Sequence, residues 1–427
     1  MRPLIRLIQK TYRMVDPLEG KRVMHNVASL SWLQAITYVL PLIILPYLFR
    51  VIGPERFGLV AFAQAFVQYF IILTDYGFSV SATREISLCH DDNARISRVF
   101  SAVMTVKTAL ALLSFLILGG IVYFVPKFRD DWMVYVLSFG AVAGGAIFPV
   151  WFFQVVEKMR YIARLNIIGE FAFVFCVLLF VRGPEDYLKV PLIGSSVLLI
   201  TGIAAQYILW SKFGMSFQWP GYKDIHRQLK AGWDVFISVV AINAYTTTRV
   251  FAVGLLTNNT LTGFYSIAER ISGAIQTFPL SSFSQAIFPR LSKIFHRNKA
   301  AAFEIMRHIQ LITIVISLIC LPVFFLLAPL IVKLVCGGTY PAAVLSLRFL
   351  LVSVFFISSN AFRVQFLLVC GRTDIYSKIH VSMAMIGLPL IIIFIYAFSY
   401  AGAAMATAVI EAGVFAITYF TVKRLKF

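Results

Sequence analysis

Residues 309–332 read IQLITIVISLICLPVFFLLAPLIV, a stretch that contains no Asp, Glu, Lys or Arg. A helix of roughly 20 apolar residues crosses the hydrocarbon core of a bilayer, so this stretch predicts a transmembrane helix. Comparable apolar runs recur along the whole chain and mark about twelve candidate spans. They cover residues 27–49, 58–78, 99–125, 132–155, 165–181, 190–211, 233–256, 262–288, 306–335, 346–369, 379–398 and 402–422.

The composition supports the same conclusion for the chain as a whole. Of its 427 residues, 60% are hydrophobic and only 13% are charged, whereas a soluble domain carries about 25% charged residues. The net charge of +19 would suggest nucleic acid as the partner of a soluble protein. Here the basic residues lie in short loops between apolar runs, which indicates membrane orientation instead. We therefore predict an all-α, polytopic membrane protein that binds no nucleic acid.

Lys and Arg are distributed unequally between the two predicted faces of the membrane. About 26 lie in the N-terminal segment and the loops on its side, against about 6 in the opposite loops. This bias predicts that both termini are cytoplasmic. In residues 1–26, Arg2, Arg6, Lys10 and Arg13 recur at helical spacing beside apolar residues, which predicts an amphipathic helix at the cytoplasmic interface.

The chain also shows a faint internal repeat. The polar segment 212–232 is predicted to be a cytoplasmic linker between two six-helix bundles, residues 27–211 and 233–427. Residues 57–64 (FGLVAFAQ) resemble residues 262–269 (TGFYSIAE), and the offset is 263 − 58 = 205. Because each half holds an even number of spans, the repeats would be parallel and would flank a central cavity.

Polar residues form a stripe on the corresponding helix of each half. Gln64, Gln68 and Asp75 share one helical face in the first half. The matching stripe in the second half consists of Glu269, Ser272 and Gln276. We expect both stripes to line the central cavity.

Three short segments carry a resemblance to a known family. These are RVIGPERFG at residues 50–58, DYGF at 75–78 and SATREI at 81–86, with fainter similarity in GGTYP at 337–341 and CGRT at 370–373. They resemble the first-loop and second-helix signature of the polysaccharide transporter family, which includes the Wzx-type O-antigen flippases. The length, span count and loop pattern of the whole chain are similar to that family as well.

The resemblance implies a two-lobed fold similar to that of multidrug and toxin extrusion (MATE) transporters. It implies a flippase that moves undecaprenyl-diphosphate-linked oligosaccharide from the cytoplasmic to the periplasmic leaflet of the bacterial inner membrane. Alternating access, driven by H⁺ or Na⁺, would be the mechanism. Membrane lipid, a polysaccharide polymerase and a chain-length regulator are the other partners that the resemblance implies.

Four basic residues inside the predicted spans are candidates for binding an anionic diphosphate. Arg249 and Arg270 lie on adjacent antiparallel spans at similar depth, and arginine donates paired hydrogen bonds to phosphate oxygens. Lys107 and Arg363 are placed nearer the cytoplasmic side, where they could receive the substrate first. The alternatives are that Arg270 pairs with an acid such as Glu269 and only joins helices, or that these side chains reach the interface.

Acidic residues within the spans are candidates for ion coupling, because their charge can change between transport states. Asp75 and Glu269 rank first since both belong to the polar stripes, although Asp75 could equally brace the second helix. Further acids lie within or at the edges of spans at Glu170, Asp234 and Glu411.

Enzyme chemistry finds no support in the sequence. We find no phosphate-binding glycine loop, no paired Cys or His spacing for a metal and no nucleophile elbow, so we predict a transporter without cofactor, metal or catalytic residue. A multidrug or organic-cation antiporter is the first alternative, but it would favour an acidic cavity. A membrane-embedded glycan polymerase or ligase is the second, but the predicted periplasmic loops are short.

Overall fold

The structure, a computed structural model, describes residues 17–87 and 93–424, without the side chains of 17–39, 278–290 and a few single positions. Residues 1–16 of the predicted amphipathic segment lie outside this description. The described residues form helices and no β-strand, which confirms the all-α prediction. The helices are α2 (Pro17–Asp75), α3 (Phe78–Ser87), α4 (Asn93–Phe124), α5 (Pro126–Arg129), α6 (Trp132–Ile147), α7 (Val150–Val155), α8 (Met159–Phe180), η1 (Pro184–Leu188), α9 (Lys189–Phe213), α10 (Tyr222–Thr246), α11 (Thr248–Leu256), α12 (Asn259–Arg297), α13 (Lys299–Cys336), α14 (Pro341–Val369) and α15 (Thr373–Arg424).

Each predicted span coincides with one of these helices or with two consecutive ones. Among the described residues, eight helices are long and apolar enough to cross a membrane, or nine if the bent pair α10 and α11 is one span. The helix count is lower than twelve because α2 and α15 each hold two predicted spans, and because α12, which holds span 262–288, is not among the eight. The arrangement is consistent with about twelve crossings.

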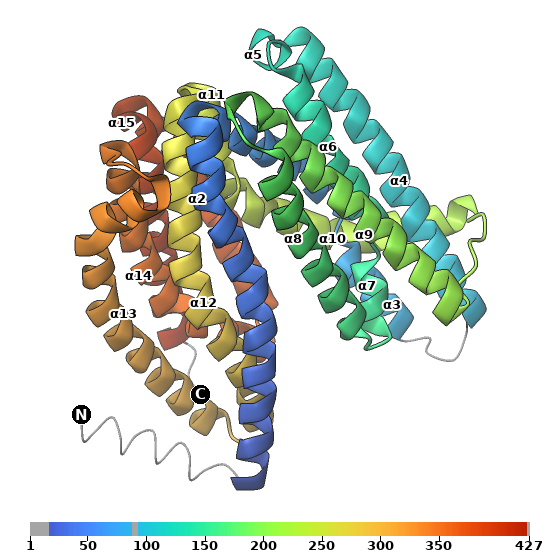
Figure 1. The fold of residues 1–427 in the computed structure, drawn as a ribbon. Coiled ribbons are helices and arrows are strands. Elements are labelled where there is room, and N and C mark those ends of the chain that lie inside the picture. The colour runs from blue at the N-terminus through green and yellow to red at the C-terminus, as the bar shows by residue number, and fades with distance from the viewer. Residues whose placement is uncertain (1–16, 88–92, 425–427) are drawn as a thin grey trace.

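The breaks inside α2 and α15 have a backbone cause. α2 consists of two helical segments that meet at Gly53, where φ is +75°. Glycine adopts positive φ without steric cost, and Pro54 follows as a favoured first residue of the next segment. Figure 1 shows the first segment rising to one end of the molecule, after which the chain descends towards α3. α15 breaks at Ser399, which takes a positive φ of +54° although it is not a glycine.

The helices group into two bundles, seen in Figure 1 on either side of the first segment of α2. α4, α6, α8 and α9 lie together in the first bundle, and α12 to α15 lie together in the second. α10 connects them, because it packs against α3 and α4 and also against α15. α2 begins and α15 ends at the same end of the molecule, which we call the terminal end.

The bundles contact each other closely through two glycines that the sequence repeat pairs. A Cβ atom added to Gly58 would lie 1.8 Å from the carbonyl oxygen of Asn259, and one added to Gly263 would lie 2.1 Å from that of Pro54. The same repeat that pairs Gly58 with Gly263 also pairs Pro54 with Asn259. Reciprocal contacts of this kind are typical of segments related by a two-fold axis.

Two basic side chains strengthen this contact at the end opposite the terminal end. Arg50 of α2 donates to the carbonyl oxygens of Leu334 and Val335 at the C-terminus of α13. Lys127 of α5 donates to the carbonyl oxygens of Gly254 and Leu255, where α11 ends. A cation is favourable at a helix C-terminus, so each side chain binds an end of the second bundle to the first.

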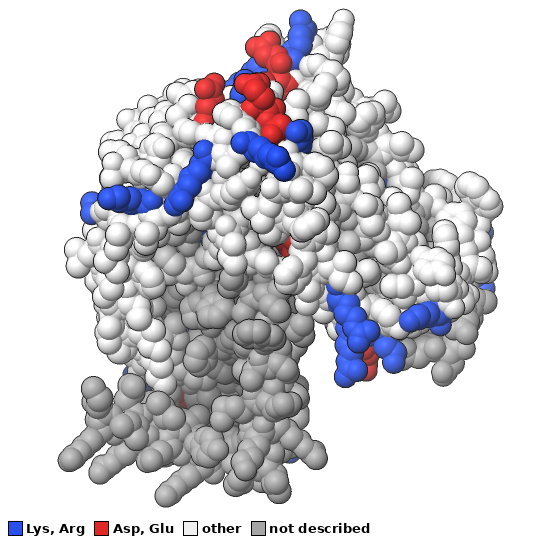
Figure 2. All heavy atoms as spheres, viewed as in Figure 1, with Lys and Arg blue, Asp and Glu red and all other residues white. Residues whose placement is uncertain are grey.

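The charge distribution over the surface fits a membrane environment. Figure 2 shows Lys, Arg, Asp and Glu gathered at the two ends of the visible face, with a nearly uncharged band between them. Large apolar side chains are exposed outside the bundle contacts, for example Leu326, Leu116 and Ile319. Such a surface requires lipid around it. The protein is therefore a multi-pass membrane protein.

We predict that Gly263→Val weakens the contact between the bundles, because a side chain has no room against Pro54. The expected loss is about 1–3 kcal/mol, observed as a lower melting temperature of the purified protein in detergent. Gly119→Val is the matched control, because a Cβ atom there meets nothing within 4 Å. Equal melting temperatures for the two variants would contradict the proposed packing.

Candidate functional site

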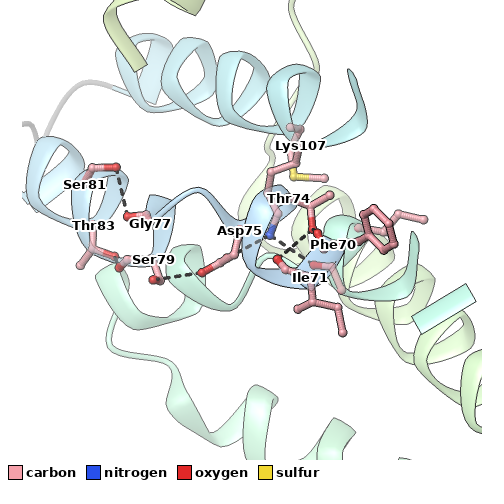
Figure 3. Close-up of polar contacts among 12 residues, drawn as sticks. Phe70, Ile71, Thr74, Asp75, Gly77, Ser79, Ser81, Thr83 and Lys107 are labelled. Atoms are coloured by element: carbon pink, nitrogen blue, oxygen red, sulfur yellow. Dashed lines mark hydrogen bonds and ion pairs between the residues drawn. The ribbon is translucent and has the colours of Figure 1, made fainter. Parts of the chain in front are cut away.

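The first bundle contains an ion pair between α2 and α4. The ammonium of Lys107 is almost completely buried, 3.5 Å from Oδ1 of Asp75, and it also donates to the carbonyl oxygen of Gly145 at 3.2 Å. Figure 3 shows these groups, with the Ser79 hydroxyl donating to the second carboxylate oxygen of Asp75. Asp75 therefore joins α2, α3 and α4, while its carboxylate stays half-exposed.

The position of Asp75 depends on the turn that follows it. α2 ends at Asp75, and Tyr76 and Gly77 both take positive φ before α3 begins. Tyr76 then stacks on Phe236 of α10, with ring centroids 4.7 Å apart. The turn thus follows directly on the Asp75 carboxylate that pairs with Lys107, and through Tyr76 it contacts α10, the helix that connects the bundles.

The second bundle contains another ion pair, between α11 and α12. Nε of Arg249 lies 3.2 Å from Oε1 of Glu269, and it also donates to the carbonyl oxygen of Thr246 at 3.0 Å. Glu411 of α15 is a further electrostatic neighbour of Arg249. The carboxylate of Glu269 on another helix thus offsets the cost of placing the Arg249 cation inside a membrane protein.

Arg270 has a different environment from its neighbour Glu269. Its guanidinium donates to Oε1 of Gln64 at 2.7 Å, and so connects α12 of the second bundle to α2 of the first. Both side chains are exposed. No carboxylate of the described residues lies within ion-pair distance of Arg270. Its remaining N–H donors are thus available for an anionic ligand.

A partly buried polar pair, Tyr245 and His380, was missed from the sequence. The hydroxyl of Tyr245 and Nδ1 of His380 are 2.7 Å apart, and the two rings stack. Tyr245 is also an electrostatic neighbour of Glu411 and Arg249. The two residues are 135 positions apart, and no local pattern in the sequence connects them.

The other residues of the predicted stripes differ in how exposed their side chains are. Gln68 and Gln276 are partly exposed. Ser272 is buried, and its hydroxyl donates to the carbonyl oxygen of Glu269. The stripe in the second half therefore does not present all of its members to open space in this conformation.

Arg363 lies apart from the other three cations. Its side chain is buried between the rings of Phe415 and Tyr419, at 4.5 Å and 5.0 Å from their centroids. One of its terminal nitrogens has no hydrogen-bond partner, and no carboxylate of the described residues pairs with it. Cation–π contacts stabilise the charge here, but they leave a hydrogen-bond donor unused.

No set of three or more His, Cys, Asp or Glu side chains among the described residues is placed to hold a metal ion. The arrangement is one of cations and carboxylates from different helices, with the exposed Arg270 joining the two bundles beside them. An arrangement of this kind is chemically able to bind an anion and to exchange ion-pair partners.

Comparison with known proteins assigns the family. Residues 23–295 match the family model described as "Polysaccharide biosynthesis protein". The chain belongs to this family. A relative from Escherichia coli (strain K12), named "Putative O-antigen transporter", is 31% identical over 391 residues, which are 90% of this chain and 93% of that protein. A protein of the same name from Shigella dysenteriae is 28% identical over 63% of this chain and 67% of its own length.

Solved structures show which fold this polysaccharide biosynthesis protein shares. The lipid II flippase MurJ, in an inward closed conformation, aligns with a TM-score of 0.76 at 11% identity, over 92% of this chain and 87% of its own. An inward-facing multidrug resistance MATE family transporter of the MOP superfamily aligns with a TM-score of 0.69 at 14% identity, over 90% and 94%. Both confirm the predicted MATE-like fold of two bundles.

The residues that suggested the family from the sequence are largely structural. Gly53 forms the break in α2, Arg50 binds the end of α13, and Gly58 packs against α12. Of the quoted segments, only Asp75 also belongs to the proposed polar site. The residues of the family signature thus mainly determine how the first two spans fold and how they contact the second bundle.

We predict that Asp75→Asn destabilises this polysaccharide biosynthesis protein, because it leaves the buried ammonium of Lys107 without its counter-charge. The expected loss is about 1–3 kcal/mol, since Asp75 is half-exposed, and it is measured as a lower melting temperature. Replacing both partners, in Asp75→Asn with Lys107→Met, should recover most of the loss.

Asp374→Asn is the matched control, because it removes an exposed ion pair with Arg372. If Asp75→Asn and Asp374→Asn melt at the same temperature, the pair with Lys107 does not support the fold.

Proposed function

We propose that this protein is a flippase that translocates an undecaprenyl-diphosphate-linked oligosaccharide from the cytoplasmic to the periplasmic leaflet. It would do so in the bacterial inner membrane by alternating access, with both termini cytoplasmic. The relatives named for O-antigen transport and the fold shared with a lipid II flippase support this proposal. The observation that carries it is Arg270, an exposed arginine at the boundary of the bundles whose hydrogen bond among the described residues goes to the neutral amide of Gln64.

The chemistry of the substrate explains the arrangement of charges. A diphosphate diester carries two negative charges, and transferring them through hydrocarbon without counter-charges is prohibitively costly. Arg270 supplies one counter-charge directly. Arg249 supplies a second when it exchanges Glu269 for a phosphate oxygen. Lys107 and Arg363 are buried here, so their proposed contact with the substrate requires another conformation.

The two bundles are the moving parts in this proposal. Gly58, Gly263, Arg50 and Lys127 hold them together at the end opposite the terminal end, which the orientation predicted from Lys and Arg makes periplasmic. If these contacts were released and the two bundles closed around α10, the site would become accessible from the periplasmic side of the membrane.

Asp75 and Glu269 remain the proposed coupling residues. Each carboxylate pairs with a cation on another helix, so a proton or Na⁺ bound to it would weaken that pair. The contact between α2 and α4, or between α11 and α12, would then change with ion binding. A polymerase and a chain-length regulator as partners follow from the same proposal.

The alternative functions fit the site less well. A transporter of organic cations would place free carboxylates at the boundary of the bundles, whereas this boundary carries Arg270 and Gln64. A polymerase or ligase would need a larger periplasmic segment. The described connections at the end opposite the terminal end are short, and the two longest hold only α5 and η1.

We predict that Arg249→Ala and Arg270→Ala each reduce export of surface polysaccharide by at least about tenfold, because each loses a charge-assisted hydrogen bond to phosphate. Lysine at either position should restore export in part, since it keeps the charge but not the paired geometry. Export is measured by gel analysis of lipopolysaccharide in a strain that lacks the gene, with protein levels checked by immunoblot.

Arg372→Ala, which removes an exposed arginine far from the site in the sequence, is the control and should export normally. Normal export by both alanine variants would refute the phosphate role. The deletion strain should also accumulate an undecaprenyl-linked glycan, and its mass would identify the cargo.

We further predict that Asp75→Asn or Glu269→Gln alters how transport in membrane vesicles depends on pH or on Na⁺. The reason is that each variant removes a carboxylate whose pair with a cation is proposed to respond to the ion. Glu304→Gln, an exposed position on α13, is the control. An unchanged pH and Na⁺ dependence in both test variants would exclude these carboxylates from coupling.

A further inference from the structure

A small cavity of about 60 Å³ lies beside Arg270, and its walls are apolar. One wall is a single face of the first segment of α2, which includes Ile44, Leu48 and Ile52. The opposite wall is the start of the second segment, with Phe57, Val60 and Ala61. These six side chains are buried, so the cavity is a wedge between the two segments of α2 that meet at Gly53.

Two further helices and one polar edge complete the cavity. Phe173 of α8 and Val190 of α9 close its side. Gln64 and Arg270 are the polar residues of the lining, and they are exposed whereas the α2 wall residues are buried. Their hydrogen bond therefore marks an edge at which the apolar cavity meets the proposed diphosphate site.

We propose that this cavity holds the isoprene unit bonded directly to the diphosphate of the lipid cargo. The proposal rests on the proposed function and adds a subsite that selects a branched polyprenyl chain over a straight alkyl chain. A prenyl diphosphate joins an apolar branched group to an anion through a single methylene, and the site places an apolar cavity beside an exposed guanidinium in the same order.

The size of the cavity limits what it can accept. It has less than half the volume of the apolar cavities of about 150 Å³ that bind benzene. It therefore fits the methyl-bearing part of one isoprene unit, and the rest of the tail remains in the bilayer. A straight chain has no branch to fill the wedge and would leave it empty, which forfeits dispersion contacts.

The test compares two ligands with the same headgroup and the same twelve-carbon main chain, farnesyl diphosphate N-acetylglucosamine and dodecyl diphosphate N-acetylglucosamine. Only the farnesyl chain carries the methyl branches and double bonds of a polyprenyl chain. Their binding to the purified protein in nanodiscs is measured by calorimetry. The wild type is expected to bind the farnesyl compound about tenfold more tightly than the dodecyl compound. This is roughly the gain in affinity that one methyl group gives in an apolar pocket. Ala61→Leu and Val190→Phe, which fill the cavity from two different helices, should abolish the preference while still binding both ligands.

Ala109→Leu, an exposed position on α4, is the control and should keep the wild-type preference. Equal affinity of the wild type for both ligands, or an unchanged preference in both filled variants that melt normally, would overturn the subsite. These results differ from a failure of the proposed function, in which neither ligand binds the wild type or binding is insensitive to Arg270→Ala.

Discussion

The cost of placing charge inside a membrane governs the polar interior of this protein. The four candidate cations are stabilised in three ways: Lys107 and Arg249 by the carboxylates of Asp75 and Glu269, Arg270 by the amide of Gln64, and Arg363 by two aromatic rings. In all four cases the partners come from another helix, so the charges also fix how the helices are rotated. Arg270 differs because its partner is neutral and belongs to the other bundle.

Under the proposed function, this arrangement would let one site serve both the empty and the loaded transporter. In the empty state, carboxylates neutralise Lys107 and Arg249, and helix packing around them stays favourable. An anionic diphosphate offers the same arginine a different partner without adding a new buried cation. Because the exposed Arg270 bridges α12 and α2, an anion that replaces Gln64 would also act on the contact between the bundles.

Much of the fold follows from local features of the sequence. Apolar runs of spanning length mark the helices, and Gly53 explains why two spans appear as one broken helix. The weak sequence repeat pairs Gly58 with Gly263, and in the structure these two glycines make reciprocal contacts between the bundles. The side-chain pairs were harder to predict from the sequence, because Lys107 and Asp75 are 32 residues apart and Tyr245 and His380 are 135 residues apart. Such pairs depend on the rotation of each helix in its bundle, which periodicity alone does not fix.

The account requires above all that Arg270 faces water between the bundles and not lipid. A cysteine placed at position 270, in a variant without the five native cysteines, tests this directly with a water-soluble maleimide. We predict labelling of this cysteine at a rate close to that of a surface site, while a cysteine at the lipid-exposed Leu326 stays unlabelled. Labelling of position 270 only by a membrane-soluble reagent would contradict it.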